Sequence, residues 1–199
     1  MGKPELLAPA GNLEKLKIAF SYGADAVYLG FQRFGLRSGA DNFTLSDLAE
    51  ARKIADQLGK RIYLTINSYL HEFELADLPE FLELIKGFAP DAIIVGDIGV
   101  ATVIRRHCSI PFHISTQASV INVAHAKAYK SLGVKRIVVG RELSLAEAAY
   151  LQKEAGVEVE MFLHGALCMS YSGQCTISNY QSARDANRGG CVQSCRHHY

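Results

Sequence analysis

The stretch GADAVYLG, residues 23–30, decides the fold because it recurs along the chain in altered forms. The later forms are APDAIIVGD at residues 89–97, GVKRIVVGRE at 133–142 and GVEVEMFLHG at 156–165. Each form begins near a glycine or proline, continues as a short apolar run and ends in glycine or polar residues. Short apolar runs bounded by such turns are typical of buried strands. We therefore interpret each stretch as a turn that enters a parallel strand.

Seven apolar runs alternate with amphipathic helical patterns along the chain. The expected strands are residues 5–8, 26–30, 61–67, 92–97, 112–116, 136–140 and 158–164. The expected helices are residues 13–20 after an Asn12 cap, 45–58, 81–88 after Pro79, 118–132 and 145–155. Ser144 and Glu147 form a capping box that opens the last of these helices. Repeated strand–helix alternation predicts a parallel sheet, and near-continuous apolar strands predict burial on both faces.

The fold class is α/β, and a (β/α) barrel of the TIM type fits the alternation best. An open doubly wound sheet is the alternative, because periodicity alone does not separate the two folds. No GxGxxG or P-loop motif follows the first strand, which removes the usual nucleotide-binding argument for the open sheet. A complete barrel has eight strands and about 250 residues, whereas seven runs are visible here. We expect an incomplete barrel, with residues 1–165 as a barrel-like catalytic domain. Residues 166–199 are its cysteine-rich tail, which we expect to continue beyond the chain end.

Composition and charge narrow the classes of function only weakly. Hydrophobic residues make up 49% of the 199 residues, which is enough for one large buried core. The net charge is +1, so there is no strong electrostatic footprint for nucleic acid or membrane. No apolar run reaches the ~18 residues of a membrane helix, and the N-terminus lacks the apolar core of a signal peptide. We expect a cytoplasmic protein, in which clustered cysteines bind metal or react rather than form disulfides.

Polar side chains follow the apolar runs, which is where a barrel places its chemistry. The residues at those ends are Ala10, Gly11, Tyr28, Asn67, Asp97, Thr116, Gln117, Arg141, Glu142 and His164. Because buried polar groups are costly without partners, the set as a whole predicts a ligand pocket. Ordinary roles stay open for each member. Asn67 or Asp97 can cap the next helix, and Gln117 can bond loop backbone. Arg141 can pair with a neighbour.

His164 carries more weight because it ends the seventh apolar run, four residues before Cys168. A histidine at that place lowers the pKa of a neighbouring thiol or donates to a bound substrate. A structural histidine bonded to a loop carbonyl is the equally weighted alternative.

Cysteines gather near the end of the chain. Four of the five follow residue 167: Cys168, Cys175, Cys191 and Cys195. The spacing contains no CxxC pair, so structural zinc is not favoured. Wide spacing among glycines suits an iron–sulfur cluster, because glycine allows close backbone approach to a bulky cofactor. A Cys168 nucleophile activated by His164 is a second hypothesis. The spacing alone leaves cluster, zinc and nucleophile open, and we assign Cys108 to the core or a loop.

The stretch EMFLHGALCMSYSGQCTIS, residues 160–178, resembles the signature of peptidase family U32, the collagenase-like proteins. The positions that match the signature are Glu160, Phe162, His164, Gly165, Ala166, Cys168, Ser172, Gly173, Cys175 and Ser178. NRGGCVQSCR at residues 187–196 resembles the second conserved stretch of the family, and residues 4–30, 67–70 and 140–145 are also similar to it. The resemblance therefore covers the whole chain.

The resemblance implies a barrel-like catalytic domain and a choice of activities. The family name implies proteolysis, whereas better-understood relatives are oxygen-independent hydroxylases of a tRNA uridine, an rRNA cytidine or a ubiquinone precursor. Prephenate is implicated as their oxygen-atom donor. The quinone members hold a [4Fe–4S] cluster on four cysteines, three of which match Cys168, Cys175 and Cys191. The fourth ligand lies beyond this chain, and Cys195 does not match it.

Three hypotheses follow from the residues and the resemblance together. The first is a cluster-dependent hydroxylase that acts on RNA. The second is a peptidase with a cysteine nucleophile. The third is a subunit or metal-binding module, not an enzyme by itself, that works only with a partner, as a quinone-pathway hydroxylase subunit with a homologous partner would. For all of them we take as candidate catalytic residues His164, Glu160, Asn67, Asp97, Gln117 and Arg141. The candidate cluster and metal ligands are Cys168, Cys175 and Cys191.

Overall fold

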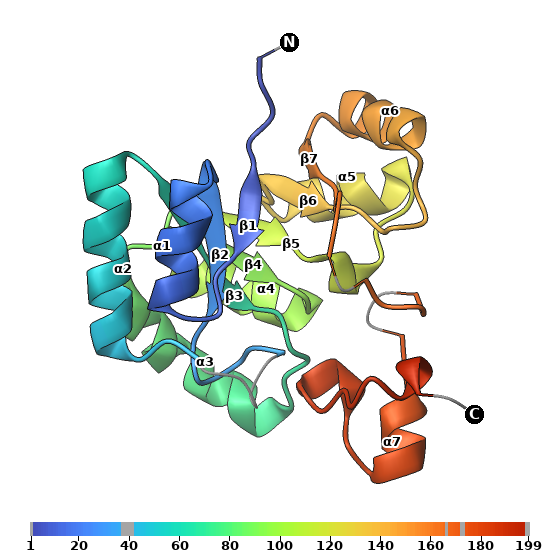
Figure 1. The fold of residues 1–199 in the computed structure, drawn as a ribbon. Helices are drawn as coiled ribbons and strands as arrows, with labels where there is room; N and C mark the ends of the chain where they lie inside the picture. The colour runs from blue at the N-terminus through green and yellow to red at the C-terminus, as the bar shows by residue number, and fades with distance from the viewer. Residues whose placement is uncertain (1, 37–41, 166, 172–173, 198–199) are drawn as a thin grey trace.

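Seven parallel strands form a single curled sheet in the computed structural model, which describes residues 2–36, 42–165, 167–171 and 174–197 (Figure 1). The strands are β1 Leu7–Pro9, β2 Ala26–Gly30, β3 Arg61–Ile66, β4 Ala92–Val95, β5 Phe112–Ile114, β6 Arg136–Val138 and β7 Glu158–Glu160. Their order in the sheet is their order in the sequence. A doubly wound sheet reverses strand order at a switch point. The prediction of an incomplete TIM-like barrel is therefore confirmed, and the open-sheet alternative is wrong.

Helices connect successive strands and cover the outer face of the sheet, except for the last helix, which follows the last strand (Figure 1). They are α1 Leu13–Ser21, α2 Leu45–Leu58, α3 Glu72–Lys86, α4 Ile98–His107, α5 Val123–Ser131, α6 Leu145–Ala155 and α7 Ile177–Ser182. The core lies between the two layers. Ile62, Leu64 and Ile66 of β3 are fully buried there, with Leu78 and Leu82 of α3 in the same cluster. Burial of side chains of this size supplies the main drive for folding, at about 1.5–3 kcal/mol each.

Caps predicted from the sequence open two of these helices. The Asn12 side chain accepts a hydrogen bond from the Lys15 amide at 3.0 Å and starts α1. The Ser144 and Glu147 side chains form the expected capping box of α6. Caps of this kind satisfy amides that have no partner inside the helix.

Helix α3 begins earlier than the sequence predicts. We expected a helix over residues 81–88 after Pro79, but α3 starts at Glu72 and contains Pro79 in its interior. The Glu74 carboxylate accepts a hydrogen bond from the His71 amide at 2.8 Å and fixes the true start. Proline removes one helical hydrogen bond. The buried face formed by Leu78 and Phe81 holds the helix together across that position.

Two further helix predictions were wrong. The sequence patterns predicted no helix over residues 98–107, but α4 lies there. Many residues of this segment are β-branched, and β-branched residues favour strands. Asp97 starts α4 by accepting a hydrogen bond from the Gly99 amide at 2.6 Å. Helix α5 begins at Val123 instead of residue 118, because Ser119 has a left-handed backbone with φ 48° and Asn122 supplies the cap. Strands β3 to β7 end one to four residues sooner than expected, and β2 has the expected bounds. β1 begins two residues later and ends one residue later than expected.

Edge strands β1 and β7 are not paired with each other within the described residues. A salt bridge spans that opening instead. Glu5, just before β1, accepts a hydrogen bond from Arg136 of β6 at 2.6 Å, although the two are 131 residues apart. Both side chains are largely buried, with 12% and 13% exposed. The ion pair between Glu5 and Arg136 thus joins the chain before β1 to β6 across the opening of the barrel.

The segment after β7 lies outside the barrel wall. Residues 174–197, which we name the tail segment, contain α7 and two 3₁₀ turns and lie beside the loop that follows β3 (Figure 1). Ala166, Ser172 and Gly173 of the signature fall outside the described residues. No helix in the described part of the chain has the length and apolar character of a membrane span.

Candidate functional site

Asn67 and Gln117 both lie close to Gly96 at the carboxyl-terminal edge of the sheet. A Cβ atom at Gly96 would lie 2.5 Å from the Asn67 carbonyl oxygen and 3.3 Å from the Gln117 Cβ. Only glycine fits so close an approach. The Asn67 side chain accepts a hydrogen bond from the Leu36 amide at 3.2 Å, which ties the loop after β2 to this edge. Two of the predicted site residues are therefore neighbours at the mouth.

Asp97 lies next to this pair but has a structural task. Its carboxylate caps α4, so the ordinary role that the sequence left open is correct. The pKa of the Tyr69 hydroxyl is raised, mainly because Tyr69 is partly buried and to a smaller extent because the negative charge of Asp97 is near. A tyrosine in the loop after β3 thus belongs to the same mouth, which the sequence reasoning missed.

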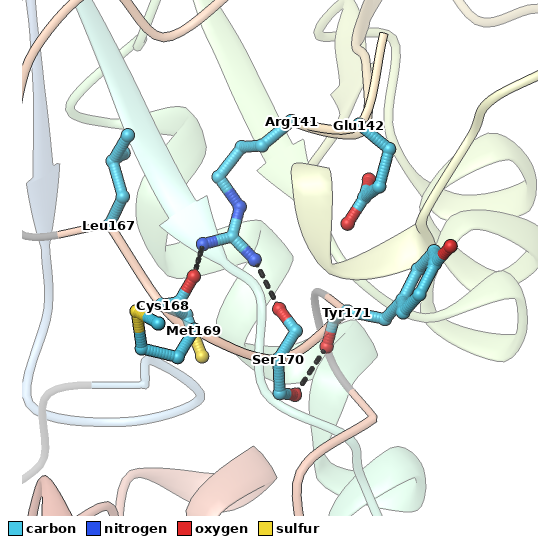
Figure 2. A pocket seen from close by; sticks show the side chains of 7 residues that line it. All are labelled: Arg141, Glu142, Leu167, Cys168, Met169, Ser170 and Tyr171. Atoms are coloured by element: carbon cyan, nitrogen blue, oxygen red, sulfur yellow. Dashed lines mark hydrogen bonds between the residues drawn. The ribbon is translucent and has the colours of Figure 1, made fainter. Parts of the chain in front are cut away.

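Arg141 joins the mouth to the signature loop (Figure 2). One of its Nη atoms donates to the Cys168 carbonyl, and the other donates to the Ser170 carbonyl at 2.6 Å. Its Nε atom is buried without a hydrogen-bond partner among the described residues. A pocket of about 290 Å³ opens here, lined by Arg141, Glu142 and residues 167–171. The expected pairing of Arg141 with a neighbour is real, but its partners are backbone carbonyls.

His164 does not end a strand as the sequence predicts. β7 stops at Glu160, and His164 lies exposed on the segment beyond it. Only Glu158, Val159 and Glu160 pair with β6, so the strand ends four residues before His164. No hydrogen bond joins His164 to Cys168 within the residues that the structure describes. The pair needed for an activated nucleophile is therefore not formed in this arrangement.

The three candidate ligands are free thiols. Cys168 and Cys191 are exposed, and Cys175 is half-buried. Thiols on loops are the donors that iron–sulfur clusters use, so the donor chemistry fits such a group. Within the described ranges, no three His, Cys, Asp or Glu side chains are gathered as metal ligands.

Local hydrogen bonds fix two of these cysteines in the tail segment. The Asn187 amide group donates to the Cys175 carbonyl at 3.2 Å. The residues on either side of Cys191 are held as well: the Gly190 amide donates to the Asp185 carbonyl at 2.7 Å, and the Val192 amide donates to the Ser178 hydroxyl at 3.2 Å. Sequence reasoning did not single out Asn187, although it lies in the second stretch that resembles the family.

Glu160 lies in the barrel interior, away from the exposed thiols. It belongs to an interior charge cluster, by which we mean Glu5, Tyr63, His113, Arg136 and Glu160. Arg136 donates to Glu160 at 3.4 Å and to Glu5 at 2.6 Å, and the Tyr63 hydroxyl donates to Glu5 at 2.9 Å. Burial raises the pKa of Glu160, and the charge of Arg136 offsets only part of that rise.

His113 is the histidine of the interior charge cluster. The residue is buried, with 5% exposed, and its ring packs edge-on against the Tyr63 ring with 5.0 Å between the ring centroids. Burial, helped by the positive charge of Arg136, lowers the pKa of His113 to about 4. Its Nδ1 atom has no hydrogen-bond partner in the described part of the chain. The members of this cluster are distant in sequence, because Glu5 precedes β1 and the others come from β3, β5, β6 and β7, so the sequence alone did not connect them.

Comparisons with known proteins agree on one family. The model of peptidase family U32 matches residues 11–199. The tRNA hydroxylation protein P1 of Bacillus subtilis (strain 168) is 46% identical over 198 residues, which are 99% of this chain and 47% of that protein. A 23S rRNA 5-hydroxycytidine synthase of Escherichia coli (strain K12) is 40% identical over 195 residues, 96% of this chain and 29% of that protein.

A solved structure supports the fold in particular. The structure of the U32 peptidase Mk0906 superposes with a TM-score of 0.67 at 16% identity and covers 81% of this chain and 69% of that one. The chain spans about half the length, or less, of the curated relatives that it matches. Sequence and structure thus agree with one assignment: the chain belongs to peptidase family U32.

Proposed function

We propose that the protein acts in the oxygen-independent hydroxylation of a base in RNA, a tRNA uridine or an rRNA cytidine. The names of two relatives, a tRNA hydroxylation protein and a 5-hydroxycytidine synthase of 23S rRNA, support this substrate class. The observation that carries the proposal is the contact of Arg141 with the Cys168 loop. This contact brings a candidate cofactor ligand to the polar mouth of the barrel. RNA is thus the expected partner.

Cys168, Cys175 and Cys191 are the residues proposed to hold an iron–sulfur cluster. When bound, such a cluster supplies one-electron chemistry. Replacing C–H by C–OH is a two-electron oxidation that also requires an oxygen atom. We propose prephenate as the donor of that atom and therefore as the two-electron oxidant, because transfer of the oxygen atom leaves the donor reduced by two electrons. A fourth ligand, which this chain does not provide, belongs to the same proposal.

The remaining residues of the mouth have roles that do not depend on the cluster. Asn67 and Gln117 are half-buried amides at the end of the barrel, where hydrogen bonds can orient a base or an organic acid. Asp97 fixes α4 beside them. Glu160 is paired in the interior, so we propose that it supports the barrel and leaves the catalytic role to the mouth.

Peptide cleavage and a role in a quinone pathway are the two alternative activities, and the experiment below distinguishes them from RNA hydroxylation. Peptide cleavage by Cys168 needs a base in contact with its thiol, and the described residues do not provide that contact through His164. A quinone-pathway subunit would require a homologous partner chain. Neither has a specific contact in its favour.

Nucleoside analysis decides among the three activities. RNA from a strain that lacks the gene is digested, and hydroxylated uridine and cytidine are measured by mass spectrometry. We expect one of them to disappear, to return with the wild-type gene and to stay absent with Cys168→Ser. Unchanged nucleosides together with a lost quinone, or with a peptide-cleaving activity of the purified protein, would contradict the proposal.

A further inference from the structure

Arg188 of the tail segment docks onto the start of α3. Its two Nη atoms donate to the two carboxylate oxygens of Glu74 at 2.7 and 2.8 Å, which makes a bidentate pair. One of them also donates to the Tyr69 carbonyl at 2.5 Å. Both charged side chains are 24% exposed, so water screens the pair only partly. The hydrogen bonds from Arg188, more than any other contact, hold the pKa of Glu74 below its usual value.

The partner of Arg188 is itself fixed. Glu74 also accepts the hydrogen bond from the His71 amide that starts α3, so the arginine binds a carboxylate that cannot swing freely. The Tyr69 amide donates to the Asn187 carbonyl at 3.4 Å beside the pair. The loop after β3 and the tail segment therefore hold each other by backbone as well as by charge.

This docking point lies within the part of the tail that carries the thiols. Asn187, next to Arg188, bonds the Cys175 carbonyl, and the turn that follows leads directly to Cys191. A Cβ atom at Gly190 would lie 2.6 Å from the Asp185 carbonyl oxygen, so that turn is tight. A displacement of Arg188 would consequently move both cysteines together.

Cys168 depends on a different arginine. Arg141, after β6, holds the carbonyls of Cys168 and Ser170. A hydrogen bond from the Arg196 guanidinium group to the Leu167 carbonyl, at 3.2 Å, links the two thiol-bearing segments. Two arginine contacts, which we name the two anchors, thus hold the thiol-bearing segments. One is made by Arg141 after β6, and the other joins Arg188 to Glu74 at the start of α3.

We infer that Arg141 and Arg188 are positioning residues for the proposed cluster ligands, Arg141 for Cys168 and Arg188 for Cys175 and Cys191. The inference rests on the proposed function for the identity of the bound group. Both guanidinium groups donate hydrogen bonds to backbone carbonyls, and Arg188 also donates to a carboxylate. These bonds order the backbone around the thiols.

The first test measures order in the protein without its cofactor. Amide hydrogen exchange is followed by mass spectrometry in Arg188→Gln and Arg141→Gln. Arg188→Gln should speed exchange in the tail segment by about tenfold, the factor that corresponds to the loss of ~1.4 kcal/mol, and leave residues 167–171 unchanged. Arg141→Gln should do the reverse. Equal exchange in wild type and both variants would overturn the inference.

Matched variants separate docking from helix capping. Glu147 caps α6 through the Ser144 amide at 2.8 Å, just as Glu74 caps α3, but has no arginine partner in the described residues. Glu74→Gln should loosen the tail segment as Arg188→Gln does, whereas Glu147→Gln should not. The double variant Glu74→Gln with Arg188→Gln should loosen it no further than either single change. Arg188→Lys, which has no bidentate fork, should restore only part of the protection.

The second test measures retention of the cofactor by the full-length protein prepared without oxygen. Release of iron to a chelator should be about tenfold faster in Arg188→Gln and in Arg141→Gln than in wild type or in Arg105→Gln, an exposed control on α4. Unchanged release with loosened exchange would overturn the positioning role. Wild-type protein without iron would contradict the proposed cofactor, and the exchange experiment would still decide whether the two anchors exist.

Discussion

The interior charge cluster and the thiol-bearing mouth treat their charged groups in opposite ways. In the interior, Arg136 is shared by Glu5 and Glu160, and each charge is balanced by another side chain. At the mouth, Arg141 binds backbone carbonyls. The thiols that follow it are left free and largely exposed. The interior is therefore built to hold the barrel together, and the mouth is built to present groups to something else.

This difference changes the meaning of Glu160. Its place in the family signature makes it a candidate for catalysis, but its carboxylate lies beside Arg136 inside the barrel. A signature residue can thus serve the scaffold that carries the site. Substitutions in the interior should cost stability, whereas substitutions at the mouth should cost activity.

Arg136→Leu should have the largest effect on stability. It leaves Glu5 and Glu160 without their shared cation, and removal of one partner from a buried ion pair costs about 3–5 kcal/mol. Urea unfolding at neutral pH measures the loss. Arg61, which also pairs with Glu5 but is 52% exposed, provides the control, and Arg61→Gln should cost no more than about 1 kcal/mol. Equal losses in the two variants would remove the distinction between interior and surface charge.

His113 should make stability depend on pH. Its folded-state pKa of about 4 lies below the usual 6.5, so the unfolded state binds a proton more readily between those values. The free energy of unfolding should therefore fall by about 3 kcal/mol as pH drops from 6.5 to 4. Glu160, with its raised pKa, changes stability in the opposite direction above pH 4.5.

The variant His113→Gln isolates that effect. Unfolding curves of wild type and variant between pH 4 and 7.5 share the contribution of Glu160, so their difference reports His113 alone. The stability gap between the two proteins should change by about 3 kcal/mol over this range. A constant gap would mean that His113 titrates normally and does not lie in a dry interior.

Gln117→Ala should have the smallest effect on stability and a large effect on function. The side chain is only half-buried, so the free energy of unfolding should change by less than about 1 kcal/mol. The level of hydroxylated nucleoside in a complemented strain should fall at least tenfold, roughly the loss of one hydrogen bond to the substrate. A variant with wild-type nucleoside levels would separate Gln117 from the site.

Much of the fold could be predicted because its signals are local. Each buried strand is a short apolar run, and caps such as Asn12 and Ser144 mark helix starts within four residues. Helix α4 was missed for the same reason, since its β-branched residues favour a strand locally while its packing against α3 and β4 favours a helix. Tertiary contacts decided that segment.

The site was only partly predictable because its contacts are distant in sequence. The mouth positions of Asn67 and Gln117 follow from the rule that barrel sites lie at strand ends. No such rule pairs Arg188 with Glu74, 114 residues away, or Arg136 with Glu5, 131 residues away. The tail segment and the interior charge cluster appear only once the chain is folded.

The iron and sulfide content of the full-length protein, purified without oxygen, tests the central claim most directly. Three proteins are compared: wild type, Cys191→Ser and Cys195→Ser. We predict that wild type and Cys195→Ser contain iron and acid-labile sulfide and absorb at about 400 nm, and that Cys191→Ser loses both. Fully active wild-type protein without iron, or equal iron in all three proteins, would contradict the account.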